Sequence, residues 1–142
     1  MTDRRARMEG DRAHREYVVT DADTALAVGS GSLPVLGTPR LVAWMEAATV
    51  AVADALAPDT SAVGVAAQTS VGTRVDIEHL TASPVGVRVE VAAELTHRDG
   101  RLLRFAVAAH HDTGEGPVLI GRGEITRVVV QTDRFLGRLP TL

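Results

Sequence analysis

The clearest periodic pattern in the chain lies between Thr38 and Pro58. Apolar side chains recur there every three or four positions, the spacing of one face of an α-helix. These positions are Leu41, Met45, Ala48, Val52 and Leu56. Thr38-Pro39 has the capping residue and early proline typical of a helix start, and Pro58 ends the segment. Because Val42, Trp44 and several alanines occupy the other faces, the pattern predicts a helix that is buried all round.

The segments on either side of this helix have the composition and alternation of β-strands. Before it, residues 14–20 predict a short strand with Tyr17 and Val19 on one face, followed by a loop over residues 21–37. Four further β-rich runs come after it, at residues 61–80, 85–98, 101–111 and 117–130. Asp99-Gly100, between the second and third of these runs, is a strong signal for a two-residue hairpin.

This order of elements predicts an α+β hotdog fold, in which a curved antiparallel β-sheet wraps around one long buried central helix. Residues 12–138 are expected to form this single domain, and residues 1–11 a flexible basic N-terminal arm. A curved open sheet leaves an exposed edge strand, which pairing with a second copy covers. We therefore expect a homodimer, and a dimer of dimers stays open as a larger assembly.

Composition narrows the chemistry that the domain can perform. The chain of 142 residues has no Cys, and all 15 of its basic residues are Arg. This excludes thiolate catalysis, Cys-ligated metals, disulfides and Schiff-base lysines. Aromatic residues make up only 3% of the chain and the net charge is −3, which argues against nucleic acid as a partner. With neither a signal-peptide pattern nor a membrane-length apolar stretch, we expect a cytoplasmic protein without a membrane partner.

Two residues of the helix are candidates for chemistry. Glu46 has apolar neighbours and no basic residue three or four positions away. Its carboxylate therefore points at a solvated gap, bonds a backbone group, or serves as a base that acts on a substrate or water. We favour the functional interpretation. Thr38 fits a helix cap and a catalytic hydroxyl equally well. Eight helical residues rise about 12 Å, so Thr38 and Glu46 share one site only if the first turn is not helical or a dimer interface joins them.

The strands hold three more candidates. His79 ends the run that follows the helix, as a surface histidine or as an acid–base group. Gly72 lies inside the same run, which implies a bulge or a close backbone approach. Arg127, in a strand of valines, predicts a buried or interface ion pair. His110 and His111 are adjacent on a strand and point to opposite faces, so we expect no metal site.

Several segments together resemble one branch of the hotdog thioesterases, the fluoroacetyl-CoA thioesterase-like subfamily. The likeness extends from about Arg15 to Phe135. The segments that carry it are GTPRLVAWMEAATVAVADALAP, SVGTRVDIEHLTASPVG, the Asp-Gly hairpin and IGRGEITRVVV. Family members carry a Thr and a Glu eight positions apart on the central helix, which Thr38 and Glu46 match. They also carry a histidine seven residues after a glycine, which His79 and Gly72 match.

The resemblance implies that the chain hydrolyses an acyl-CoA thioester as a homodimer. It implies a catalytic set of Thr38, Glu46 and His79, and it places Gly72 and Arg127 beside the substrate. Thr38 or Glu46 would supply or activate the nucleophile and His79 would relay protons. Whether water or Thr38 attacks stays open. No cofactor is expected, because coenzyme A enters as part of the substrate.

The loop before the helix bears on the acyl group. Its apolar residues Leu33, Val35 and Leu36 indicate a lid over a small or medium acyl chain. Fluoroacetyl-CoA-selective members are aromatic in this loop, so this sequence departs from them and the acyl group stays open. Two alternatives are a hotdog protein that binds an acyl group or small ligand without turnover, and a hotdog enoyl-CoA hydratase or dehydratase. The hydratases place an Asp and a His about five residues apart, and we find no such pair before a strand.

Overall fold

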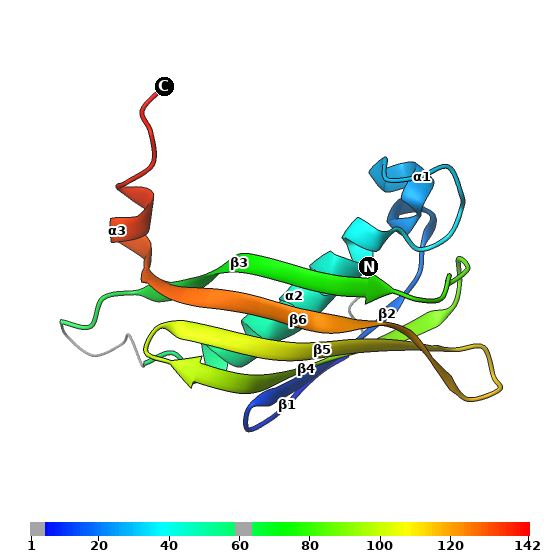
Figure 1. Cartoon of the computed structure of the whole chain (residues 1–142), viewed down its shortest axis with the longest axis horizontal. Helices are drawn as coiled ribbons and strands as arrows, with labels where there is room; N and C mark the ends of the chain where they lie inside the picture. The colour runs from blue at the N-terminus through cyan, green and yellow to red at the C-terminus, as the bar shows by residue number, and fades with distance from the viewer. Residues whose placement is uncertain (1–4, 59–63) are drawn as a thin grey trace.

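The structure is a computed structural model that describes residues 5–58 and 64–142. A curved six-stranded antiparallel sheet wraps around one long helix, α2 (Thr38–Leu56), which confirms the α+β hotdog fold (Figure 1). The strands in chain order are β1 (Arg5–Glu9), β2 (Arg12–Val18), β3 (Gln68–His79), β4 (Arg88–Asp99), β5 (Leu102–Asp112) and β6 (Pro117–Gln131). In space their order is β1-β2-β4-β5-β6-β3, so β1 and β3 are the two edges.

Three short helical segments complete the chain. A 3-10 turn, η1 (Asp21–Asp23), and a one-turn helix, α1 (Ala25–Val28), lie where the sequence predicted a loop without regular structure. The third, α3 (Thr132–Leu136), follows β6. Figure 1 shows α1 and α3 near opposite ends of β3. No helix among the described residues is both long and apolar enough to cross a membrane.

Helix α2 packs its predicted apolar stripe into the sheet. Leu41, Met45, Ala48 and Val52 are fully buried among core strand residues such as Phe105. On a neighbouring face, Trp44 stacks on Tyr17 of β2 with ring centroids 4.3 Å apart. Another face of α2 is exposed, so the expectation of a helix buried all round is wrong for a single chain. The reason is that the sheet of one copy covers only part of the helix circumference.

The predicted strands and hairpin are present with small shifts of their ends. Val87, Val89 and Val91 are buried and alternate with exposed neighbours, as expected for a half-buried strand. Gly100 adopts φ 57° in the turn that joins β4 to β5, which confirms the hairpin, although its two turn residues are Gly100 and Arg101 because Asp99 still pairs with Leu102. The expected run at residues 61–80 becomes a strand at Gln68, and its residues 61–63 lie outside the described part of the chain.

The N-terminal segment differs from the expectation. Instead of a flexible arm, residues Arg5–Glu9 form strand β1, which pairs antiparallel with β2 from Arg5↔Glu16 to Glu9↔Arg12. Gly10, with φ 60°, makes the tight turn between them. The sequence was misleading because an edge strand facing solvent tolerates charged residues, and its composition resembles that of an unstructured arm. The division into an arm and a domain of residues 12–138 otherwise stays a prediction.

Candidate active site

A threonine and a histidine meet at the N-terminal end of α2. The Thr38 hydroxyl and Nδ1 of His79, the last residue of β3, are 2.8 Å apart. The helix cap is Gly37, whose backbone is extended and whose carbonyl accepts from the amide of Leu41. The cap interpretation of Thr38 is therefore wrong. Because Thr38 is the first residue inside the helix, its hydroxyl is engaged with His79 instead of capping.

The other ring nitrogen of His79 has no such contact. Its Nε2 is buried and has no hydrogen-bond partner in the described part of the chain. Burial lowers the pKa of His79 from its ordinary value of 6.5. The main chain of Thr81 raises this pKa, but by less than burial lowers it. The ring is therefore neutral at pH 7. In the tautomer with its proton on Nε2, the Thr38 hydroxyl donates to Nδ1, the arrangement in which a histidine can take a hydroxyl proton.

The lowered pKa of His79 predicts the pH dependence of the reaction. A protonated ring cannot accept the proton of Thr38 or of water, so activity is present above this pKa and lost below it. Because the pKa of His79 is lowered, kcat/KM should be nearly constant between about pH 7 and 8 and then fall up to tenfold per unit in more acidic buffer. The measurement is the rate of hydrolysis of the acyl-CoA that the family resemblance implies as substrate, at low substrate concentration from acid to neutral pH. A rate that does not fall in acidic buffer contradicts this assignment.

Thr38 and His79 open into a pocket of about 440 Å³ on the surface. The pocket brings the three predicted lid residues, Leu33, Val35 and Leu36, together with this pair. Leu36 is buried at 2% exposure, whereas Leu33 is 62% exposed. The lid loop therefore has one end anchored in the core and an apolar side chain free at the pocket.

A buried pair that the sequence did not reveal supports this loop. Ser83 Oγ and His111 Nδ1 are 2.7 Å apart, and the two residues are 0% and 7% exposed. The amide of Leu36 donates to the carbonyl of Ser83, and Val35 forms a β-bridge with Pro84. His111 thus points inward in a structural role. No group of three or more His, Asp or Glu side chains placed to hold a metal occurs within residues 5–58 and 64–142.

A second set of polar residues lies further along α2. Arg127 of β6 reaches Glu46, with Nη1 3.4 Å from Oε2, so the ion pair expected for Arg127 is present. Its Nε and Nη2 donate to the hydroxyl and the carbonyl of Ser70, at 2.8 and 3.0 Å. Burial lowers the pKa of Arg127, and the charges of Glu46 and Asp54 oppose this. Ser70 was missed because nothing in the sequence distinguishes it from the other serines.

Gly72 lies directly against the Glu46 carboxylate. A Cβ at position 72 would be 2.7 Å from Glu46 Oε2, which confirms the close approach predicted for this glycine. The β3–β6 register shifts between Gly72 and Arg74, so the predicted bulge is also present. In a regular strand, residues seven apart face opposite sides. The extra residue of the bulge shifts this alternation by one position, so both Gly72 and His79 face α2.

Alanine at position 72 is expected to disturb the site without unfolding the protein. The new methyl group would push the Glu46 carboxylate aside, and because that group is the end of a flexible side chain, the fold can accommodate the shift. We expect Gly72→Ala to lower kcat/KM by about 100-fold. Thr73→Ala, at the neighbouring exposed position, is the matched control and should be near wild type. Full activity of Gly72→Ala, with an unchanged melting temperature, would show that the position of Glu46 does not matter.

The structure thus groups the predicted residues into two sets. Thr38 and His79 form the first, at the pocket, and Glu46, Gly72 and Arg127 form the second. No hydrogen bond or ion pair found among the described residues joins the two sets. This agrees with the estimate that one helix holds Thr38 and Glu46 about 12 Å apart.

Comparison with known proteins identifies the family. The sequence model of the family described as fluoroacetyl-CoA-specific thioesterase matches residues 19–133. The chain belongs to this thioesterase family. The matched range includes every residue of both sets, so the family likeness covers the candidate site as well as the fold.

Individual relatives support the same family. A fluoroacetyl-CoA thioesterase from Streptantibioticus cattleyicolor is 38% identical over 66 residues, which is 46% of this chain and 45% of that protein. The alignment therefore spans less than half of that relative. A solved structure of the fluoroacetyl-CoA thioesterase FlK superposes with a TM-score of 0.78 and 26% identity, covering 94% of this chain and 98% of that one. A thioesterase superfamily member from Thermus thermophilus has a TM-score of 0.75 and 25% identity, covering 92% and 88%.

Proposed function

We propose that this protein hydrolyses acyl-CoA thioesters to the free acid and coenzyme A. The observation that carries the proposal is the hydrogen bond between the Thr38 hydroxyl and Nδ1 of His79, at the wall of a pocket with an apolar loop. A histidine that is neutral at pH 7 and bonded to a hydroxyl is equipped for base catalysis. Membership of a thioesterase family supports the choice of a thioester as the bond that is broken.

The proposed mechanism moves one proton through His79. The ring takes the proton of the attacking hydroxyl as oxygen bonds to the thioester carbonyl carbon. The main-chain amide of Thr38 at the start of α2 would stabilise the oxyanion of the tetrahedral intermediate, as would that of the partner's Gly72 in the dimer proposed below. The next amides of the helix, those of Arg40 and Leu41, already donate to the carbonyl of Gly37. The carbon–sulfur bond then breaks, and His79 returns the proton to the leaving thiolate. If Thr38 attacks, water later hydrolyses an acyl-Thr38 ester, whereas direct attack by water gives the acid at once; neither route needs a cofactor.

We propose further that a second copy of the chain completes the site. Strand β3 is an edge of the sheet, and an unpaired edge favours antiparallel pairing with a partner strand. A register with Asp76 on the two-fold axis, in which the bulged residue Thr73 is left unpaired, sets Gly72 of the partner subunit opposite His79. Since Gly72 lies against Glu46, the partner's Glu46 then comes beside the unpartnered Nε2 of His79 and accepts a hydrogen bond from its N–H. Thr38, His79 and the partner's Glu46 would act as one catalytic set.

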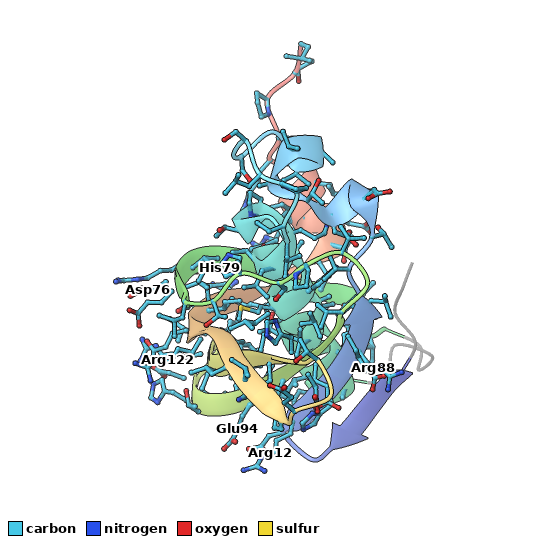
Figure 2. The ribbon with its side chains drawn as sticks, turned by 90° about the vertical axis from the view of Figure 1, so that its right-hand side faces the viewer. Arg12, Asp76, His79, Arg88, Glu94 and Arg122 are labelled. Atoms are coloured by element: carbon cyan, nitrogen blue, oxygen red, sulfur yellow. The ribbon has the colours of Figure 1, made fainter. Side chains whose placement is uncertain are left out.

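In this register Asp76 lies opposite the partner's Asp76, an unfavourable like-charge pair, whereas the residues on either side of it favour the pairing. Val75 and Ile77, which share the face of His79, would each lie opposite the other in the partner strand. On the outer face Arg74 would lie opposite the partner's Glu78, a favourable cross-strand pair. Figure 2 shows Asp76 and Arg122 on the outer side of the sheet, while His79 lies on the side of α2. A dimer of dimers and a cytoplasmic location stay predictions from the sequence.

The substrate class is tested by free-thiol release from a panel of acyl-CoAs. The panel runs from acetyl to long-chain and includes fluoroacetyl and phenylacetyl. With its aliphatic residues Leu33, Val35 and Leu36, the lid loop should favour small or medium acyl groups. We expect turnover well above background that is lost in His79→Ala. A folded protein that releases no thiol from any member would overturn the proposal and favour acyl binding without turnover, or hydration of an enoyl-CoA.

A further inference from the structure

Helix α3 presents apolar side chains to solvent. Phe135, Leu136 and Leu139 are 38%, 54% and 57% exposed, whereas the other phenylalanine of the chain, Phe105, is fully buried. The amide of Thr132 donates to the carbonyl of Ala67 at 3.0 Å, which holds the start of α3 beside the start of β3. Figure 1 shows α3 projecting from the sheet at this edge. A cluster of exposed apolar residues held in one place indicates an unfilled contact surface.

The position of α3 relative to β3 determines what this surface can reach. In an antiparallel pair, the start of one strand lies beside the end of the other. In the dimer proposed above, on which this inference rests, α3 therefore lies just beyond the end of the partner's β3. The residue that follows that end is Leu80, which is 49% exposed and lines the same pocket as the 62% exposed Leu33.

The pocket of the same chain is out of reach. Strand β3 has twelve residues, so its two ends are roughly 40 Å apart, and α3 and the Leu80 turn lie at opposite ends. Within a single copy, the exposed leucines of the pocket and the exposed residues of α3 thus stay separate. Only a second copy brings the two apolar surfaces together.

We propose that α3 of each subunit docks against Leu80 and Leu33 of its partner and closes the open side of the partner's acyl pocket. Phe135 and Leu136 are then residues of the neighbouring active site and help to select its acyl group. The lid residues Leu33, Val35 and Leu36 are all aliphatic. Phe135 of the partner's α3 would therefore bring an aromatic side chain to the acyl pocket. The apolar surfaces on both sides leave solvent on docking, which is the driving force for the contact.

Cross-linking tests the contact directly. The chain has no cysteine, so a double variant Leu80→Cys/Leu136→Cys carries the only two thiols. A disulfide needs Cα atoms within about 7 Å, which excludes a bond between these positions inside one chain. We expect a covalent dimer under mild oxidation, with a short bismaleimide as a second reagent that tolerates imperfect geometry. The matched control is Glu94→Cys/Leu136→Cys, since Glu94 lies on β4, away from the β3 edge, and should give no cross-linked dimer (Figure 2).

Acyl selectivity is the second readout. In Phe135→Ser/Leu136→Ser we expect kcat/KM for medium-chain acyl-CoA to fall about tenfold, with a smaller change for acetyl-CoA. Phe135→Leu keeps an apolar side chain, so it should change the ratio of medium-chain to acetyl-CoA hydrolysis less than the double serine variant does. Both positions are exposed in the single chain, so each subunit should keep its fold, which circular dichroism checks.

The outcomes separate this inference from the proposed function. A dimer by size exclusion that hydrolyses acyl-CoA, but neither cross-links through position 136 nor changes its selectivity, overturns the role of α3 alone. A monomeric protein that remains active overturns both the role of α3 and the shared site. A folded protein without thioesterase activity overturns the proposed function, whereas cross-linking in it would still support the contact.

Discussion

His79→Ala is expected to lower kcat/KM for acyl-CoA hydrolysis by about 10³-fold. The variant removes the group that accepts a proton from Thr38 or water and returns it to the thiolate, so both proton transfers must pass through solvent. His79 is half-buried at the end of β3, and the main contact of its side chain is one hydrogen bond to Thr38. The fold should therefore tolerate a smaller side chain at this position. The measurement is free-thiol release, with thermal unfolding to confirm the native state.

The matched control for this variant is His97→Ala. His97 is exposed on β4, so its removal changes the histidine content without touching the pocket. Wild-type rates for His97→Ala alongside a large loss for His79→Ala would assign the effect to the site. If His79→Ala retained more than about a tenth of the wild-type kcat/KM, proton transfer through His79 would be excluded.

Glu46→Gln is expected to cost about 10² to 10³ in kcat/KM, and mixing it with His79→Ala should restore activity. Glutamine can still accept a hydrogen bond from Arg127, so the variant removes the charge while keeping the contact. Each proposed site takes Thr38 and His79 from one copy and Glu46 from the other. A mixed dimer of the two variants then contains one intact site and one doubly altered site.

The recovery has a defined size. Random reassembly makes about half of the dimers mixed, and each has one working site of two, so the mixture should regain about a quarter of wild-type activity. Each variant alone gives the background. A mixture prepared without subunit exchange controls for simple addition of the two residual rates. Failure to recover activity after proven exchange would mean that Glu46 and His79 of the same chain act together, and the shared site would be wrong.

Much of the fold could be predicted because its signals are local. The three- and four-residue spacing between Thr38 and Pro58 predicted α2, since a helix buries one face at that period whatever packs on it. The glycine inside the first run after the helix predicted the bulge at Gly72 for a similar reason. A missing side chain is visible in the sequence, and it matters only where the backbone bends or a neighbour comes close.

The features that the sequence did not predict depend on exposure to solvent and on contacts between residues far apart in the chain. Strand β1 resembled a disordered arm, because charged residues suit both an edge strand and an unfolded segment. Thr38 was given a cap role that Gly37 performs, since one residue of shift at a helix start is not encoded by residue type. The pairing of Ser83 with His111 joins segments that no local pattern relates.

The sequence by itself determined the elements, their order and, through its family likeness, which residues to consider. Only the tertiary structure decided how those residues are grouped. Arg127 reaches Glu46 across 81 positions of sequence because the β3–β6 register brings Arg127 opposite Gly72, next to the helix. Thr38 meets His79 because β3 ends beside the first turn of α2. Periodicity specifies the face of an element, whereas contacts between elements follow from register and packing, which appear only when the chain is folded.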